Sequence, residues 1–475
     1  MRSFRSIDKA AEEVGIPISA DCNDPNGPAM GFFHFEATID KSGRRISAFK
    51  AFLNKEIARE RRHRLSVCTG AVVSRLELDV TAGKVSGVHF QSSHRSTNAN
   101  QFFVKARREV ILCAGAICSA QILLLSGVGP RAPESSPAPD LKIPIVKELP
   151  AVGTRFSDHY SFPIMMEVPK KESFHVLESL WGLWHILIWF LFGKGLMSVT
   201  SMPSAFYIRT GAIDAKTMSI RAREQEGSDN LDNSLPANIP DVEIMVMPSN
   251  GLERHVPGHS LLTLYPTLIQ PHATGSVELK SRDPCDNPRI IHPMLLDKRD
   301  REAARLAVRF TMRLAAAFQD SGYPYPASFA FAPGNRPDLL SHWEKSGDVA
   351  AATHQPSSVA LPGENATEAT EYSRQQPKTW ENVTDEEIDD YIRRVSHTSL
   401  HFSCTCPMSN DEKSGVVDQR LRVYGFQNLR IADASVFPRV PSSHTMLPVM
   451  MIAERCAGFI KEAWGEPKSH SSELS

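Results

Sequence analysis

The chain has 475 residues, of which 41% are hydrophobic and 23% charged, and its formal net charge is −1 at neutral pH. This is an ordinary globular composition, without the basic excess expected of a nucleic-acid-binding protein or the acidic excess of a solvating tail. Eight scattered cysteines do not make the framework of a disulfide-rich secreted domain. Cys404 and Cys406 have no Cys/His pair at zinc spacing elsewhere, so no metal site is expected.

The chain begins with MRSFRSIDKAAEEVG, which is charged and lacks the apolar core of a signal peptide. If Met1 is the native start, a cytoplasmic location is therefore expected. Residues 1–60 predict a helix, a loop and then a polar hairpin, in which HFEATID and RRISAFKAFL flank Lys41-Ser42-Gly43.

Residues 65–125 predict a strand pair, a buried strand and a helix. LSVCTGAVVSRLELD alternates in polarity and is rich in β-branched residues, and KVSGVHFQ follows it across a glycine-containing turn. ARREVILCAGA passes from basic residues into an apolar run, which predicts a buried strand. A helix from about residue 117 to 125 follows.

The segment LLLSGVGPRA (123–132) comes close to the G-x-G-x-x-G/A loop that holds a dinucleotide pyrophosphate. Such a loop must follow a strand and open a helix, because the phosphate binds the N–H groups at the start of that helix. Here Gly127 and Gly129 come after a helix, and Pro130 removes an N–H donor. The segment is therefore interpreted as a turn that ends the helix.

After Pro150 the sequence predicts a second domain built on an antiparallel sheet. PIMMEV, SAFYIRTG, DVEIMVMP, LLTLYPTLIQ and GSVELKS read as short strands separated by long loops. LWGLWHILIWFLF (180–192) is shorter than a membrane span, so it predicts a buried or interfacial helix that ends at Gly193-Lys194-Gly195. Contact of its tryptophans with a membrane surface is an open alternative.

The last part of the chain combines a loop-rich region with a clear helix start. Residues 322–380 are rich in Pro, Ser, Gly and Gln, which predicts loop or partial disorder. In TDEEIDDYIRRV, Thr384 and Glu387 predict a capping box, and this interpretation is preferred over a glycosylation site at Asn382. MLPVMMIAERCAGFIKEAW predicts an amphipathic closing helix.

The sequence contains TGAVVSRL (69–76), GAICSAQILLLSGVGP (115–130), GSVELKSRDPCDNPRI (275–290) and, near its end, IADASVFPRVPSSHTMLPVMMIAE. Together these segments resemble the glucose–methanol–choline (GMC) family of FAD-dependent oxidoreductases. GAICSAQILLLSGVGP (115–130) is similar to a family signature, although Ala120 stands where proline is usual. TGAVVSRL, GSVELKSRDPCDNPRI and GVVDQRLRVYGFQNLRIADASVFPRVPSSHTMLPVMMIAE are similar to family segments in order and spacing. The resemblance covers nearly all of residues 10–465 apart from 322–380.

The resemblance implies the oxidation of an alcohol, with proton removal from its hydroxyl and hydride transfer to N5 of FAD. His401 in HFSCTCPM matches the position of the family's catalytic base, and His444 in PSSHTMLP matches its second active-site position. An imidazole that titrates near neutrality suits this proton transfer. His397 lies outside the motif and is interpreted as structural. Since Phe402, Ser403, Cys404 and Pro407 replace commoner family residues, a pocket of different shape and charge is expected.

The resemblance also implies the flavin contacts. Val73 would meet the adenine end through its backbone, and Ala114 and Gly115 would line the nucleotide. Asp433 and Ala434 would approach the pyrophosphate and ribityl chain, and Thr445 and Met446 would pass beside the isoalloxazine. Independently of the family, a carboxylate between buried strands such as that of Asp433 needs a polar partner.

The family's opening unit of strand, glycine-rich turn and helix has no counterpart in the printed chain. A truncated gene or gene model, a degenerate copy, and a second chain that supplies the unit are all open explanations. Weak FAD binding by the chain as printed is accordingly expected. An inactive remnant or partner-binding protein, and a lyase that uses the same flavin without net redox change, are the alternatives to an alcohol oxidase or dehydrogenase. The apolar segments of the second domain favour a hydrophobic, even aromatic, alcohol.

The predicted fold is of the α/β (α+β) class, with an incomplete Rossmann-like FAD domain and an antiparallel-sheet substrate domain. Residues 1–150 are expected to form part of the FAD-binding domain and 151–395 the substrate domain. Residues 396–465 would return to the FAD domain with the catalytic histidines, and 466–475 would be a disordered tail. A small-molecule alcohol is the expected partner, with neither nucleic acid nor a transmembrane span.

Overall fold

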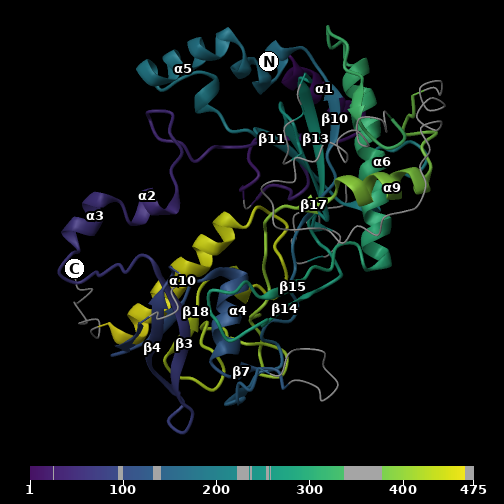
Figure 1. Ribbon diagram of the computed structural model, residues 1–475. Helices are drawn as coiled ribbons and strands as arrows, with labels where there is room; N and C mark the ends of the chain where they lie inside the picture. The colour runs from purple at the N-terminus through teal and green to yellow at the C-terminus, as the bar shows by residue number, and fades with distance from the viewer. Residues whose placement is uncertain are drawn as a thin grey trace, which may run out of the picture. The chain divides into compact units, whose positions relative to one another are not determined.

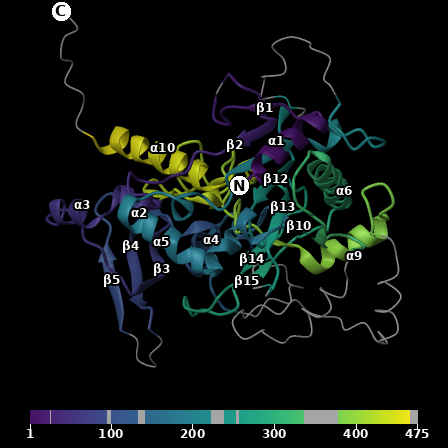
Figure 2. The same ribbon diagram turned by 90° about the horizontal axis from the view of Figure 1, so that it is seen from above.

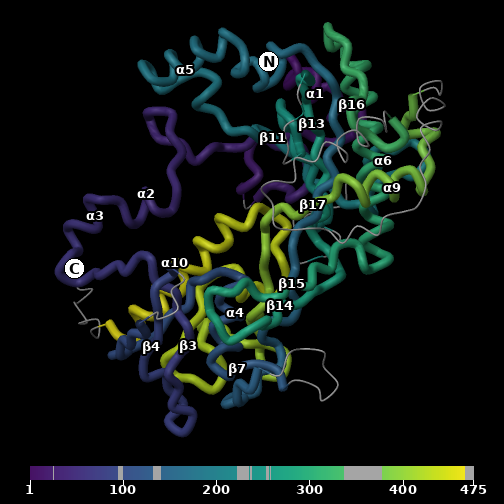
Figure 3. The backbone as a smooth tube through the Cα atoms, viewed as in Figure 1, coloured from purple at the N-terminus to yellow at the C-terminus, as the bar shows by residue number. Residues whose placement is uncertain are grey.

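In a computed structural model the chain forms two compact units, and Figure 3 traces the backbone through them. Unit 1 contains Met1–Arg64, Tyr160–Ile269 and Lys298–Ser399; unit 2 contains Leu65–His159, Gln270–Asp297 and Leu400–Ser475. The structure describes all residues except 25, 95–99, 132–140, 222–234, 236–237, 253–255, 257, 336–376 and 466–475. Most of the predicted loop-rich region and the whole predicted tail therefore lie outside the described residues.

Unit 1 is organised around a large sheet (Figure 1). The sheet is antiparallel except where β1 pairs with β2, as expected for the second domain. The predicted strand in GSVELKS is not part of it, because residues 276–278 pair in a separate small sheet of unit 2. Its central strands VEIMVM (242–247) and LLTLYPTL (261–268) are buried along their whole length, which explains why most of their residues are apolar. The main path of strands is β1 (Ile18–Ser19), β2 (Gly31–His34), β11 (Ser204–Ile208), β12 (Val242–Met247), β13 (Leu261–Leu268), β10 (Ile164–Glu167) and β16 (Phe329–Phe331), with β9 (Tyr160–Ser161) joining β13 to β17 (His397–Thr398).

Helices cover this sheet. Helix α6 (Lys298–Asp320) packs on β13 and β10 through its buried apolar face, and α9 (Asp385–Val395) packs on α6, as the view in Figure 2 shows. The predicted capping box is confirmed, because Thr384 Oγ1 accepts from Glu387 N at 3.2 Å and Glu387 Oε2 accepts from Thr384 N at 2.9 Å.

Residues 1–64 cluster with unit 1, whereas the sequence prediction placed them with residues 65–150. Helix α1 (Ser3–Glu13) packs against α6. The buried carboxylate of Glu172 accepts the backbone N–H groups of Arg2 and Ser3 at 2.7 and 3.1 Å. A carboxylate at a helix N-terminus is favourable, so this long-range contact holds α1 on the unit that contains the sheet.

The predicted hairpin around Gly43 is wrong beyond a single β-bridge between Ile39 and Arg45. Its second half instead contains helix α2 (Ala48–Phe52), and helix α3 (Lys55–Glu60) follows directly. Both begin at an N-cap side chain, since Ser47 Oγ accepts from Lys50 N and Asn54 Oδ1 accepts from Ile57 N. These caps decide the local structure in favour of helix.

The apolar segment after residue 179 forms helix α5 (Leu180–Phe192), and the predicted end is confirmed by Gly193, which adopts φ 62°. Single-turn 3-10 helices η1 (Lys170–Glu172), η2 (Phe174–Glu178), η3 (Leu196–Ser198) and η4 (Thr210–Ala212) also belong to unit 1. Within the ranges that the structure describes, no helix has the length and apolar character needed to cross a bilayer.

Unit 2 has small sheets around helix α4 (Gly115–Leu125). The predicted strand pair is confirmed as β3 (Ala71–Asp79) and β4 (Lys84–Ser92), to which β5 (Gln101–Lys105) adds a third strand. Strand β6 (Val110–Leu112) pairs in parallel with β18 (Leu429–Ile431), and the closing helix is α10 (Met446–Trp464). The remaining elements are β7 (Val128–Gly129), β8 (Lys147–Glu148), β14 (Ser276–Glu278), β15 (Arg289–Ile291) and the 3-10 helix η7 (Ala434–Val436).

The interpretation of Gly127 as a helix-ending residue is confirmed. Helix α4 ends at Leu125, and Gly127 adopts φ 75°, a conformation that residues with a Cβ rarely adopt. A Cβ at this position would lie 2.3 Å from the carbonyl oxygen of Pro144. The turn then leads into β7, which pairs with β8 rather than opening a second helix.

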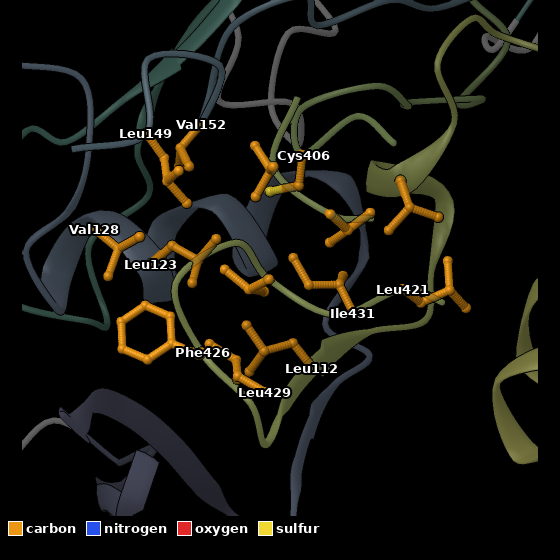
Figure 4. Packing of buried hydrophobic residues seen from close by; sticks show 14 of the residues in the cluster. Leu112, Leu123, Val128, Leu149, Val152, Cys406, Leu421, Phe426, Leu429 and Ile431 are labelled. Atoms are coloured by element: carbon orange, nitrogen blue, oxygen red, sulfur yellow. The ribbon is translucent and has the colours of Figure 1, made fainter. Parts of the chain in front are cut away.

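The core of unit 2 joins α4 to the strands and loops near the C-terminus. Figure 4 shows Leu123 and Val128 packed with Cys406 and Ile431. At the edge of this core, Arg430 Nε donates to Glu109 Oε2 at 2.7 Å, and the two side chains are only 3% and 4% exposed. Burial raises the pKa of the Glu109 carboxyl, but the hydrogen bonds from Arg430 and Trp464 outweigh it and lower the pKa overall.

The buried Glu109–Arg430 pair yields a stability prediction. Arg430→Met leaves the Glu109 carboxylate buried without its main partner and should lower the free energy of unfolding by about 3–5 kcal/mol. The double variant Glu109→Leu, Arg430→Met should recover most of this loss. Arg131→Met, which breaks the exposed pair with Glu148, is the control and should cost less than about 1 kcal/mol. Urea titrations at pH 7 measure the free energy of unfolding of all three variants. Equal losses in Arg430→Met and Arg131→Met would contradict the prediction.

Candidate active site

The segment that begins at His401 is held on both sides by backbone hydrogen bonds. Ser403 and Ser157 exchange N–H···O bonds of 3.2 and 2.9 Å. Cys404 N and Cys406 N donate to the carbonyl groups of Ala434 and Ser435 at 3.1 and 2.8 Å. The motif HFSCTCPM is therefore an extended segment that lies between the strand-like segment at Ser157 and the turn at Ala434 and Ser435. Its first residue, His401, is half-buried.

The structure brings the two sequence-predicted histidines together. The imidazole centroids of His401 and His444 lie 5.4 Å apart, with an angle of 46° between the rings. His444 comes from the loop before α10, so the pair joins two segments that are distant in sequence. His397 is placed separately, in unit 1, where its ring bonds the Tyr265 hydroxyl and the Val395 carbonyl group.

A buried carboxylate that was not predicted from the sequence contacts the His401 end of this pair. The side chain of Asp158 is 0% exposed. Its Oδ1 accepts the backbone N–H groups of His159 and His401 at 2.9 and 2.8 Å, and its Oδ2 lies 3.1 Å from Nε2 of His292. An Asp-His pair between the apolar residues Phe156 and Phe162 was the available signal, because a buried charge requires partners.

His159 is in direct contact with His401. Their Nδ1 atoms are 2.9 Å apart, and the ring planes are perpendicular at a centroid distance of 4.9 Å. One Nδ1 must donate a proton and the other must accept it, so both rings cannot be imidazolium ions at the same time. The contact therefore allows at most one of the rings of His159 and His401 to be an imidazolium ion, and it couples the tautomer of His401 to that of His159.

Four of the residues predicted to meet the flavin converge where β6 and β18 end. Ala114 and Gly115 follow β6 and start α4, and Asp433 and Ala434 follow β18. The Asp433 carboxylate accepts from Gly115 N at 2.9 Å and from the Ser119 hydroxyl at 2.6 Å through Oδ2. Its Oδ1 accepts from Ser435 N at 2.9 Å. Asp433 thus joins the two turns rather than extending away from the protein.

The backbone at this junction is open in a way that suits a nucleotide. Gly115 has φ 80°, and a Cβ placed on it would meet nothing within 4 Å. Ala114 is exposed, and Met446 at the start of α10 is 48% exposed behind the half-buried Thr445. The exposed backbone of Ala114 and the open space at Gly115 are what contact with a bound nucleotide would require.

Val73 is placed differently from the other predicted flavin contacts. It lies in β3, which packs on α4. Three residues later, Leu76 N donates to Ser126 Oγ, and Ser126 Oγ donates to the Ile122 carbonyl group. This attachment is at the C-terminal end of α4, whereas Gly115 starts that helix.

Comparison with known proteins identifies the family. Models of the N- and C-terminal parts of GMC oxidoreductases match residues 2–161 and 271–453. The chain therefore belongs to the GMC oxidoreductase family, whose members bind FAD. It is 27% identical over 460 residues to an oxygen-dependent choline dehydrogenase from Burkholderia lata, a match that covers 96% of this chain and 66% of that protein. The chain thus spans slightly less than two thirds of that relative's length.

Solved structures show the same fold. An FAD-dependent oxidoreductase from Chaetomium thermophilum matches with a TM-score of 0.72 and 20% identity, covering 98% of this chain and 72% of that one. A fungal aryl-alcohol oxidase matches with a TM-score of 0.67 and 21% identity, covering 97% and 71%. The α/β fold predicted from the sequence is thereby confirmed.

The three hydrogen bonds of Asp433 lead to a second stability prediction. Asp433→Ala should lower the free energy of unfolding by at least about 2 kcal/mol, because it leaves buried donors unpaired. The matched control is Asp411→Ala, which also removes three hydrogen bonds, from Lys413 N, Ser414 N and Ser414 Oγ, but in an exposed loop. The control should cost much less. Thermal and urea unfolding of both variants test this, and equal destabilisation would show that Asp433 holds no buried junction.

Proposed function

We propose that this chain carries the alcohol-binding and proton-transfer site of an FAD-dependent alcohol oxidase or dehydrogenase. The observation that carries the proposal is the pair of imidazoles of His401 and His444, 5.4 Å apart, in which the backbone N–H group of His401 donates to the buried Asp158 carboxylate. Two adjacent imidazoles can hold one substrate oxygen and remove its proton near neutral pH. Family membership supports the reaction class.

In the proposed reaction His401 is the general base. In the tautomer that this reaction requires, Nδ1 of His401 carries the proton of the 2.9 Å contact with Nδ1 of His159, and the hydroxyl proton of the alcohol is taken up at Nε2 of His401. His444 hydrogen-bonds the same oxygen and orients the carbon that bears the hydrogen. FAD, when bound, supplies the acceptor for the hydride that leaves this carbon. Loss of the proton and the hydride together converts the alcohol into a carbonyl compound.

The proposed cofactor contacts come from the turns that Asp433 joins. Ala114, Gly115 and Ala434 would contact the cofactor through their backbone, and Asp433 would hold these turns in place through its own hydrogen bonds. Thr445 and Met446 would lie beside the isoalloxazine ring, and Val73 would meet the adenine end. Flavin binding should therefore survive the loss of a catalytic histidine.

The substrate class is the next question for experiment. The named relatives act on choline and on aryl alcohols, and the apolar strands of unit 1 favour a hydrophobic alcohol. A panel of choline, substituted benzyl alcohols and aliphatic primary alcohols, assayed with oxygen and with an artificial electron acceptor, would identify both the alcohol and the acceptor. Failure of every alcohol to reduce bound flavin would contradict the proposal.

Substitution of the base should separate chemistry from binding. In a preparation that carries stoichiometric FAD, His401→Ala should slow reduction of the flavin by the alcohol by roughly 10²–10⁴-fold, while the bound flavin remains. His444→Ala should also slow it, and the double variant should lose less than the product of the two single effects. Anaerobic stopped-flow absorbance measures the rates. Wild-type flavin reduction by His401→Ala would show that this histidine is structural.

Asp158 is proposed as a positioning residue for His401. Asp158→Ala removes the acceptor of the His401 N–H group and should lower kcat by roughly 10–100-fold with little change in KM, because small displacements of a base slow proton transfer. Asp158→Asn keeps one oxygen for the two backbone N–H groups and should recover much of the rate. An equal fall in kcat for both variants, or a rise in KM alone, would contradict the positioning role.

A further inference from the structure

Helix α5 exposes an unusual amount of apolar surface. Nine of its thirteen residues are large apolar side chains that are 44% to 85% exposed. Isolated exposed apolar residues are common in soluble proteins, but a continuous patch of this kind marks an interaction site. These nine are Leu180, Trp181, Leu183, Trp184, Ile186, Leu187, Phe190, Leu191 and Phe192.

Only a few residues of α5 attach this helix to the rest of unit 1. Gly182 is buried, and a Cβ there would lie 2.1 Å from the carbonyl oxygen of Leu177. At the other end, Trp189 Nε1 donates to the carbonyl group of Gly43 at 2.9 Å. The helix, labelled α5 in Figure 1, is therefore held at both ends, while most of its large apolar side chains are exposed.

The segment that contacts α5 is strongly basic. Residues 41–64 contain nine Lys and Arg side chains and only two Glu, in a chain whose total formal charge is −1. The guanidinium of Arg44 lies 5.9 Å from the Trp189 ring centroid, and Lys50 Nζ donates to the Arg45 carbonyl group at 2.9 Å. The same segment exposes Phe49 and Phe52 in α2, at 62% and 63%. Exposed apolar and cationic side chains thus occur together.

We propose that α5 and residues 41–64 form a docking surface for an anionic lipid bilayer. A helix of thirteen residues is about 20 Å long, shorter than the roughly 30 Å hydrocarbon core, so it would lie in the interface and not span it. Tryptophan favours the membrane interface, and α5 holds three of the six tryptophans of the chain. The nearby Lys and Arg side chains would meet lipid phosphate and carboxylate groups.

Charge argues against the main alternative, a second copy of this chain. In a symmetric dimer through α5, the basic segment of each copy would approach the basic segment of the other. Like charges at such an interface are unfavourable, whereas the anionic surface of a membrane is complementary. The inference does not depend on the proposed catalytic activity, because lipid binding requires neither FAD nor substrate.

Binding of the full chain to lipid vesicles tests the proposal. Vesicles of phosphatidylcholine with 30% phosphatidylserine should float with the protein, and pure phosphatidylcholine vesicles should bind it at least roughly 10-fold less tightly. Raised salt should weaken the binding. Tryptophan fluorescence of the unaltered protein should shift to the blue on binding and be quenched by brominated lipid. Absence of flotation and of quenching with the anionic vesicles would overturn the proposal.

Matched variants separate the two components of the surface. Leu183→Gln with Phe190→Gln should weaken vesicle binding roughly 100-fold. The controls Val67→Gln with Leu296→Gln, also exposed but elsewhere in the chain, should not. Arg45→Glu with Lys50→Glu should weaken binding at least roughly 10-fold, unlike Lys298→Glu with Arg393→Glu. Circular dichroism checks that each variant is folded. Equal loss in the controls would overturn the proposal, as would concentration-dependent dimerisation that only Leu183→Gln with Phe190→Gln abolishes.

Discussion

The arrangement of unit 2 depends on the carboxylate of Asp433. Its two oxygens accept hydrogen bonds from the first turn of α4 and from η7, so the turns that follow the paired strands β6 and β18 are joined to each other. The carbonyl groups of η7 in turn accept the N–H groups of the segment that follows His401. One buried carboxylate therefore sets both the open backbone at Gly115 and the position of the histidine segment.

Local signals allowed much of the fold to be predicted from the sequence. The Thr384 capping box, the Gly127 turn and the Gly193 helix end each depend on residues within a few positions, and the structure confirms all three. The helices α2 and α3 were missed although Ser47 and Asn54 cap them, because Lys41-Ser42-Gly43 was interpreted as the turn of a hairpin. Attachment of α1 to the sheet unit depends on Glu172, about 170 positions away, and no local pattern reveals it.

In the candidate site, too, features with a sequence motif could be predicted and long-range contacts could not. The proximity of His401 and His444 could be predicted because both match family motifs, and a motif carries three-dimensional information that spacing alone does not. Asp158, His159 and His292 belong to no motif that was recognised, and their contacts with one another and with His401 arise only in the folded chain. The rings proposed to react could therefore be named from the sequence, whereas the carboxylate that accepts the His401 N–H group could not.

The open junction at Gly115 also determines the reactivity of its neighbour Cys113. This thiol is accessible to solvent, but its pKa is raised to about 11. Partial burial of the thiol is the larger cause, and the negative charge of the nearby Asp433 is the smaller one. Only the thiolate is nucleophilic, and at pH 7 about one molecule in 10⁴ would carry it. An accessible cysteine beside the proposed cofactor site would thus react slowly with alkylating reagents and oxidants. A change in its alkylation rate would report any molecule that covers the junction or alters the charge on Asp433.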